Sequence, residues 1–208
     1  MMILQLTPED HDMSYFEENK IVSSFFSIGL IEKAVNLIAA IFTRRPFQSA
    51  VYSCKKARKK LISSIDKYDY VVCSMIRTSS YIDLIPKNKL IVDMVDLLSK
   101  SYSKSKENTN SQFFKLIYKL EAGRLASMER YVSEHARCVL LVNKEEAEEL
   151  NRFQNNAKWI PNGVNSSLFN YDKINLSFSY DIVFLGTMNY QPNIDAILWL
   201  DKYVLDYL

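Results

Sequence analysis

The chain has 208 residues, of which 48% are hydrophobic and 24% charged, and its 13 tyrosines and 11 phenylalanines can fill a substantial core. This composition excludes disordered, collagen-like and disulfide-scaffold proteins. The formal net charge of +2 is too small to indicate a nucleic-acid partner. The length fits one large domain, or one domain with part of a second.

Five short apolar runs predict buried strands. They show little alternation of apolar and polar residues, which is typical of parallel strands covered on both faces. In chain order they are MMILQL (1–6), YVVCSMI (70–76), LIVDMV (90–95), CVLLV (138–142) and DIVFLG (181–186).

Residues 21–42 form a long apolar stretch that Glu32 and Lys33 interrupt midway. Neither half is long enough to span a bilayer. A packed amphipathic segment and a membrane-surface helix both fit, and we favour the packed segment. A basic run follows, for which we favour a solvated helix face over attraction to anionic lipid headgroups. It comprises Arg44, Arg45, Lys55, Lys56, Arg58, Lys59 and Lys60.

Helical patterns separate the apolar runs, so the chain is predicted to be α/β with a mostly parallel sheet and right-handed crossovers. One long helix is predicted over 112–135, and its polar face carries Glu121, Arg124 and Glu129, which can pair at one-turn separations. A basic helix is also predicted over 51–66, and a polar loop over 104–112. Asn143 and Glu146 form a capping box that predicts the start of a helix running to Phe153. Pro192 predicts the start of the last helix.

The cysteines and histidines indicate no metal site or catalytic cluster. Cys54, Cys73 and Cys138 are widely spaced, so we expect buried thiols in a reducing compartment. Of the two histidines, His135 ends a predicted helix, where a surface position facing the helix dipole is expected. The N-terminus lacks the pattern of a signal peptide, so we expect a cytoplasmic protein.

Ligands of parallel α/β sheets bind beyond the carboxyl ends of the strands. Asp93 and Asp96 lie at the end of the run 90–95. If the strand ends near Val95, Asp96 is free in the loop at the carboxyl edge; the alternative is that Asp96 caps the next helix. Neither a GxGxxG motif nor a P-loop is present, which argues against a free-standing dinucleotide-binding domain.

Several motifs resemble those of GT-B glycosyltransferases. WIPNGVNSSLF (159–169) and DIVFLGTMNYQPNIDAILWL (181–200) resemble the domain junction of the retaining group 1, or family 4, enzymes. FTRRPFQSAVYS, IVDMVDLLS and KLEAGRLASMERYVSEHARCVLLVNKEEAEEL resemble the branch of exosortase-associated (PEP-CTERM) sugar transferases. The similarity covers most of residues 40–208.

The resemblance implies two Rossmann-like domains facing each other across a cleft. It assigns 1–160 to an acceptor-side domain, 161–180 to an interdomain junction with Pro161, Asn162 and Gly163, and 181–208 to the start of a donor domain. Gly186, with the backbone N–H groups of Thr187 and Met188, would approach the phosphates of the donor. Asp96 would stand beside the reacting sugar as the catalytic residue.

The implied reaction transfers a sugar, with retention, from a nucleotide-sugar to a saccharide or lipid-linked acceptor, in cell-surface polysaccharide biosynthesis. It implies no metal and no cofactor, and we expect peripheral contact with the inner face of the membrane. Against the family pattern, the chain begins at the second strand and stops after the first helix of the donor domain. We therefore expect the chain alone to be inactive, with a complementing chain carrying the donor half. The alternatives are a non-catalytic remnant or binding module that keeps part of the fold, and an unrelated α/β module.

Overall fold

The computed structural model describes residues 2–5, 18, 20–108, 111–166, 182–189 and 191–205. The chain divides into two compact units, Met1–Asn162 and Gly163–Leu208. Each is considered by itself below. The predicted strand over 181–186 begins with a residue outside the described ones.

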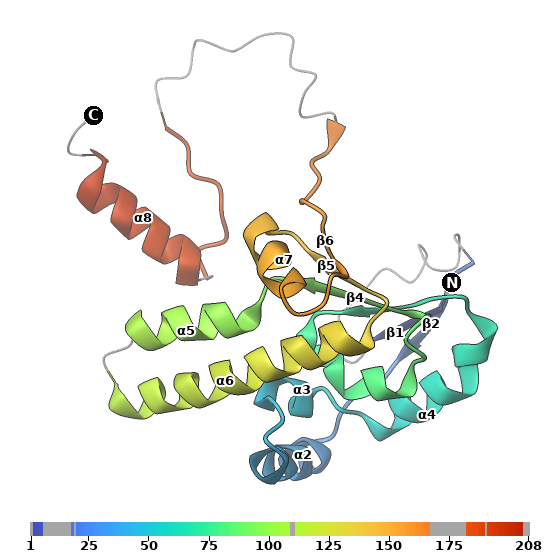
Figure 1. Cartoon of the computed structure of the whole chain (residues 1–208). Helices are drawn as coiled ribbons and strands as arrows, with labels where there is room; N and C mark the ends of the chain where they lie inside the picture. The colour runs from blue at the N-terminus through green and yellow to red at the C-terminus, as the bar shows by residue number, and fades with distance from the viewer. Residues whose placement is uncertain are drawn as a thin grey trace. The chain divides into compact units, whose positions relative to one another are not determined.

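The first unit is built on parallel strands, which confirms the predicted α/β class (Figure 1). Within the described residues, the strands form a two-stranded sheet, β1-β2, and a four-stranded sheet of order β3-β4-β5-β6, which is compatible with a Rossmann-like fold. All neighbouring strands are parallel. The strands are β1 Met2–Gln5, β2 Val22–Phe25, β3 Val71–Ser74, β4 Leu90–Val95, β5 Cys138–Leu141 and β6 Ala157–Trp159.

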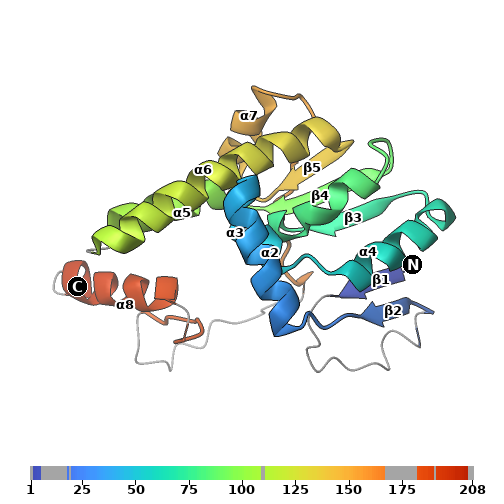
Figure 2. The ribbon, with the colours of Figure 1, turned by 90° about the horizontal axis from the view of Figure 1, so that it is seen from below.

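Helices lie between the strands, and α5 and α6 pack side by side (Figure 2). The long helix predicted over 112–135 is confirmed at both ends. The α-helices of the first unit are α2 Leu30–Thr43, α3 Phe47–Val51, α4 Lys55–Ser64, α5 Leu98–Asn108, α6 Gln112–His135 and α7 Lys144–Asn151, with 3-10 helices η1 Ile65–Lys67 and η2 Ile76–Leu84. In the second unit, α8 spans Gln191–Tyr203, as the position of Pro192 predicts.

The core lies between α6 and one face of the four-stranded sheet. Along β4, Leu90, Val92 and Met94 are buried and alternate with half-buried residues. Leu125 and Val132 of α6 are fully buried against this face. The prediction that both faces are covered is wrong for the described residues, because Val72 on β3 is 62% exposed.

The two glutamates predicted on the polar face of α6 are buried instead, Glu121 at 2% and Glu129 at 3% exposure. Glu121 Oε1 accepts a hydrogen bond of 3.2 Å from the backbone N–H of Gln48, at the start of α3. Glu129 accepts the backbone N–H of Ser99, at the start of α5, at 2.9 Å and the Ser99 hydroxyl at 2.5 Å. Each carboxylate therefore satisfies the open N–H groups and the positive dipole end of another helix, a role that helical spacing does not reveal.

Three other predicted elements differ in the structure. The helix over 51–66 is broken at Cys54, whose N–H donates to Tyr81 Oη at 2.8 Å. The loop over 104–112 is mostly helical, because α5 continues to Asn108. The stretch over 21–42 begins with the strand β2 and continues as α2, where Ala40 is buried but Ile31 and Phe42 are 83% and 82% exposed, so the favoured packed segment is wrong for the described residues.

The run over 182–186 is not a strand. Its residues have no strand partner among those that the structure describes, and a single extended segment is not stable without one. Its side chains are exposed, and Val183 and Leu185 are the most exposed of them.

The predicted burial holds for two of the three cysteines, and His135 lies at the surface as predicted. Cys54 and Cys73 are buried free thiols, and Cys138 is half-buried. His135 ends α6 at the surface, where its ring stacks on Tyr131 and its Nδ1 lies 2.8 Å from the Tyr131 carbonyl oxygen.

We predict that Glu129→Ala lowers the free energy of unfolding by about 3 kcal/mol, because it leaves the Ser99 N–H unpaired and opens a cavity. Glu129→Gln keeps a hydrogen-bond acceptor and should lower the free energy of unfolding by less than Glu129→Ala does. The exposed Glu148→Ala is the control, with an expected change under about 0.5 kcal/mol. Urea unfolding measures all three.

The shifted pKa of Glu129 predicts how its contribution to stability changes with pH. Burial raises the pKa of the Glu129 carboxyl above its ordinary value of 4.5, and the hydrogen bonds from Ser99 partly oppose this. The stabilisation from a group with a raised pKa is complete below 4.5 and is lost as the pH rises through the raised pKa. The wild type should therefore lose stability relative to Glu129→Gln over this rise; a constant difference from pH 4 to pH 8 would contradict the assignment.

Candidate functional site

The carboxyl ends of β3 to β6 form one edge of the four-stranded sheet, since these strands are parallel. The chain stays hydrogen-bonded along this edge after the strands end. Val142 N–H donates to the Val95 carbonyl oxygen at 2.9 Å, and Ile160 N–H donates to that of Leu141 at 2.9 Å. The edge is therefore a rigid platform for the side chains that leave it.

The backbone at this edge is strained at two neighbouring strands. Val95 has φ 67° and Met75, directly after β3, has φ 62°. Positive φ is an outlier for a β-branched residue and costs on the order of 1–3 kcal/mol. The pairing of β4 with β5 also shifts register between Asp93 and Val95, which is the signature of a β-bulge. Bulge and strain together turn the chain sharply at Asp96.

Asp96 is exposed directly after β4, which ends at Val95. Its backbone N–H donates to the Met94 carbonyl oxygen at 2.8 Å. Within the described part of the chain, its carboxylate makes no hydrogen bond. The structure thus agrees with the interpretation that placed Asp96 free in the loop at the carboxyl edge.

The alternative, that Asp96 caps the next helix, does not hold, because other carboxylates take the N–H groups there. Leu97 N–H donates to Glu146 Oε2 at 2.7 Å, and Ser99 donates to Glu129. The predicted cap of α7 is confirmed for Asn143, which accepts the N–H groups of Glu145 and Glu146. The Glu146 carboxylate, however, accepts a hydrogen bond at the start of α5. Asp96 therefore does not cap this helix.

An aromatic side chain that the sequence did not single out belongs to the same edge. Trp159, the last residue of β6, is 50% exposed, and its Nε1 donates to the Val142 carbonyl oxygen at 3.1 Å. Lys144 Nζ lies 5.9 Å from the Trp159 ring centroid. A fixed, exposed indole face can pack against the C–H face of a sugar ring. Exposure at a strand end is a tertiary property, so residue patterns do not predict it.

Nearby, Lys100 and Glu149 form an ion pair of 2.6 Å between α5 and α7. Both side chains are partly exposed, so the pair contributes little to stability. It nevertheless joins α5, which begins two residues after Asp96, to α7.

The predicted junction residues Pro161, Asn162 and Gly163 follow β6 directly. The two compact units divide between Asn162 and Gly163. Neither Asn162 nor Gly163 has a positive φ, and both residues are exposed, so the Asn-Gly pair does not form a turn that needs a left-handed backbone.

The predicted donor residues Gly186, Thr187 and Met188 lie together in the second unit, all exposed. A Cβ on Gly186 would lie 2.8 Å from Asn193 Nδ2 and 2.9 Å from Phe184 Cε1. The Asn193 amide donates to the Thr187 carbonyl oxygen at 3.0 Å. Glycine at this position therefore admits the Asn193 side chain in the structure. Asp96 belongs to the other unit.

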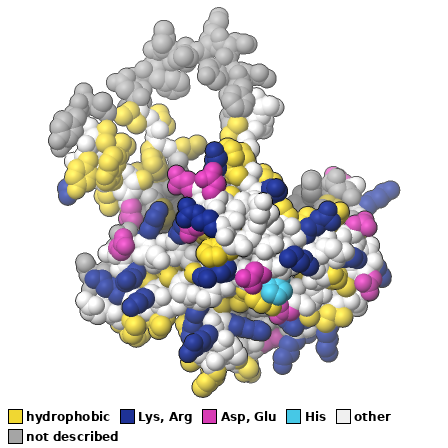
Figure 3. Space-filling model, viewed as in Figure 1, with side chains coloured by type: hydrophobic (Ala, Val, Ile, Leu, Met, Phe, Trp, Pro, Cys, Tyr) yellow, Lys and Arg dark blue, Asp and Glu magenta, His cyan; other side chains and the backbone are white. Residues whose placement is uncertain are grey.

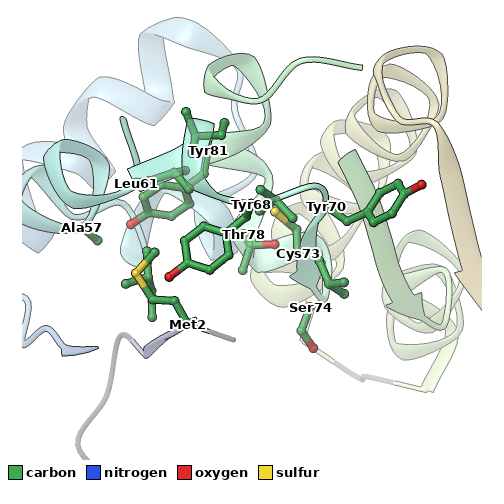
Figure 4. Close-up of a pocket in the computed structure, with 13 residues that line it drawn as sticks. Met2, Ala57, Leu61, Tyr68, Tyr70, Cys73, Ser74, Thr78 and Tyr81 are labelled. Atoms are coloured by element: carbon green, nitrogen blue, oxygen red, sulfur yellow. The ribbon is translucent and has the colours of Figure 1, made fainter. Parts of the chain in front are cut away.

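A cavity of about 500 Å³ lies elsewhere in the first unit, between β1, α4 and β3 (Figure 4). Its lining is mostly apolar. Burial raises the pKa of the Cys73 thiol to about 11 and that of the Tyr81 hydroxyl to about 12. At neutral pH the Cys73 thiol and the Tyr81 hydroxyl are therefore both protonated.

Comparisons with protein-family models, with curated proteins and with solved structures found no match. Among the helices that the structure describes, none combines the length and the apolar character needed to cross a membrane. No three His, Cys, Asp or Glu side chains in the described ranges come together as metal ligands.

We predict that Val95→Gly is at least as stable as the wild type and gains up to about 1 kcal/mol, because glycine adopts a positive φ without strain. The control is Val72→Gly in extended β3, which should lose about 1 kcal/mol. Urea unfolding of both variants measures the difference. Equal losses at the two positions would contradict strain at Val95.

Proposed function

We propose that the chain carries the acceptor-side part of a retaining glycosyltransferase, which transfers a sugar from a nucleotide-sugar to a saccharide or lipid-linked acceptor. The observation that carries the proposal is the exposed Asp96, without a hydrogen bond from the described residues, on a strained strand end at the carboxyl edge. The motif resemblance of residues 159–200 supports it. A surface carboxylate held by a costly backbone conformation is typical of a functional site.

The roles follow from the chemistry of the transfer. Asp96 accepts a hydrogen bond from the acceptor hydroxyl and orients its oxygen toward the anomeric carbon of the donor. The bond from this carbon to the nucleotide phosphate breaks as the bond to the acceptor oxygen forms on the same face. The hydroxyl proton passes to the leaving phosphate oxygen. The Trp159 ring packs against the acceptor sugar.

For the donor, we propose the segment Gly186–Met188 of the second unit. Its residues are exposed, and the Asn193 amide that fills the space at Gly186 sits on a flexible side chain. A phosphate that approached Gly186 would displace this amide and take up neighbouring backbone N–H groups.

The proposal predicts saccharide binding at the Asp96 edge. The ¹⁵N-labelled chain is titrated with octyl glycosides of glucose, galactose, mannose and N-acetylglucosamine below their micelle concentrations. At least one should shift the amide signals of Asp96 and Val142 and the indole signal of Trp159. Asp96→Asn should weaken this binding by at least about tenfold, through loss of a charged hydrogen-bond acceptor.

The matched control is Asp66→Asn, at an exposed position of the 3-10 helix η1, which should bind as the wild type does. No shift at the three reporters with any glycoside, or equal affinity of Asp96→Asn and the wild type, would rule out the acceptor role.

We further propose that the chain binds an anionic membrane surface and takes its acceptor there. Helix α2 presents Ile31, Val35, Ile38 and Phe42 at helical spacing, and all four are exposed, Ile31 at 83% and Phe42 at 82%. In the described chain, this stripe has no protein cover. It fits the alternative of a membrane-surface helix, which the sequence left open.

Basic side chains lie beside this stripe. Glu32 of α2 accepts the N–H of Lys55 at 2.9 Å, and Asn36 donates to the Ser53 carbonyl oxygen at 2.8 Å, so α2 is tied to the start of α4. Figure 3 shows hydrophobic and basic side chains next to one another over the region where Figure 1 places α2 and α4. The exposed cations are Arg44, Arg45, Lys55, Lys56, Lys59 and Lys60. Each contributes about 1 kcal/mol near an anionic surface.

We predict that the chain co-sediments with vesicles of phosphatidylglycerol and phosphatidylcholine at low salt and less so at high salt. Ile38→Asp should reduce the bound fraction at least about fivefold, because it places a charge in the apolar stripe. Leu116→Asp, at a similarly exposed position of α6, is the control and should bind normally. Absence of binding to anionic vesicles at low salt would refute the membrane contact.

A further inference from the structure

Two strand edges face the same cavity without pairing. Met2 and Leu4 of β1 and all four residues of β3 line the space of about 500 Å³. Yet β1 belongs to the two-stranded sheet and β3 to the four-stranded one. Figure 4 shows Met2 on one side of the cavity and Cys73 and Ser74 on the other. The cavity therefore lies between β1, at the edge of one sheet, and β3, at the edge of the other.

The backbone of β3 presents hydrogen-bonding groups to this cavity. Val71 N–H donates to the Lys89 carbonyl oxygen at 2.9 Å, and Met75 N–H donates to that of Asp93 at 2.6 Å. Along a parallel strand, successive residues turn their N–H and C=O groups to opposite sides. The groups of Val72 and Ser74 therefore point away from β4, and among the described residues β3 has no other strand neighbour.

The floor of the cavity is apolar. It is formed by Ala57 and Leu61 of α4 and Ile65 of η1, all buried in the core. Val72, at the edge, is among the more exposed apolar residues of the sheet. A small apolar molecule would cover the floor and leave the Val72 and Ser74 backbone groups unpaired. An extended peptide with apolar side chains satisfies both, because its backbone pairs with the edge and alternate side chains reach the floor.

We propose that this gap is a docking site for an extended apolar segment of another polypeptide, which adds as a parallel strand beside β3 and connects it to β1. Every strand pair in both sheets is parallel, so a parallel addition continues the existing pattern. Strand addition places the new backbone about 4.8 Å from β3, the ordinary spacing of neighbouring strands. This proposal does not depend on the proposed glycosyltransferase activity.

The probe is a soluble, fluorescein-labelled octapeptide of alternating valine and threonine with a lysine at each end. Fluorescence anisotropy should give saturable binding to the full chain with a Kd below about 100 µM. A peptide of the same sequence with N-methyl groups on alternate residues loses the N–H donors of one edge. It should bind at least about tenfold more weakly.

Val72→Lys places a charge at the edge of β3, which opposes strand addition, and should weaken binding at least about tenfold. Val183→Lys, at another exposed valine in the second unit, is the control and should bind as the wild type does. Circular dichroism verifies the fold of both. The N-methylated peptide needs no protein variant and so keeps the test decisive if Val72→Lys fails to fold.

Amide hydrogen exchange locates the peptide. Bound peptide should slow exchange at Val72 and Ser74 and leave Cys73, which already pairs with β4, unchanged. Absence of binding, equal affinity of the N-methylated peptide, or protection at other residues would overturn the proposal. A dimer that protects Val72 and Ser74 without peptide would also overturn it, in favour of a second copy as the occupant.

Discussion

The two buried carboxylates of α6 are the constraint on which the first unit depends. Glu121 and Glu129 lie eight residues apart on the buried side of one helix, and each accepts N–H groups from the start of another helix, α3 or α5. Their desolvation is costly, so the hydrogen bonds must form for the core around Leu125 and Val132 to close. Because α5 begins directly after Asp96, Glu129 also fixes the direction in which the chain leaves the carboxyl edge.

The candidate site follows from this anchoring. The start of α5 is held by Glu129 and Glu146, and the end of β4 is held by its ladder to β5. The connection between the end of β4 and the start of α5 is short, and it joins these two fixed points through the β-bulge and the positive φ of Val95. Asp96 is thereby presented to solvent on a rigid backbone. A preorganised carboxylate of this kind loses little entropy on binding, which is the physical basis of the proposed acceptor role.

Residue patterns predicted the elements whose signals are local. The helical spacing from Phe113 to Val132 located α6, the apolar runs located β1, β3, β4 and β5, and Asn143 marked the start of α7. Features that depend on tertiary partners were missed. Glu129 is polar but buried because the start of α5 requires an acceptor, and the strand β2 contains two serines. The run at 182–186 is apolar but has no strand neighbour among the residues that the structure describes. Asp96 was predicted from its place at a strand end, whereas the exposed indole of Trp159 depends on the fold.

The central claim is that the carboxyl edge of the four-stranded sheet holds the acceptor sugar. Photolabelling with a diazirine-bearing alkyl glycoside, followed by mass spectrometry of the digested chain, tests it most directly. The account predicts labels in the peptides that contain Asp96 and Trp159, and competition by the unlabelled glycoside. Labels confined to peptides from the opposite end of the strands, such as those with Asp66 and Lys87, would contradict it.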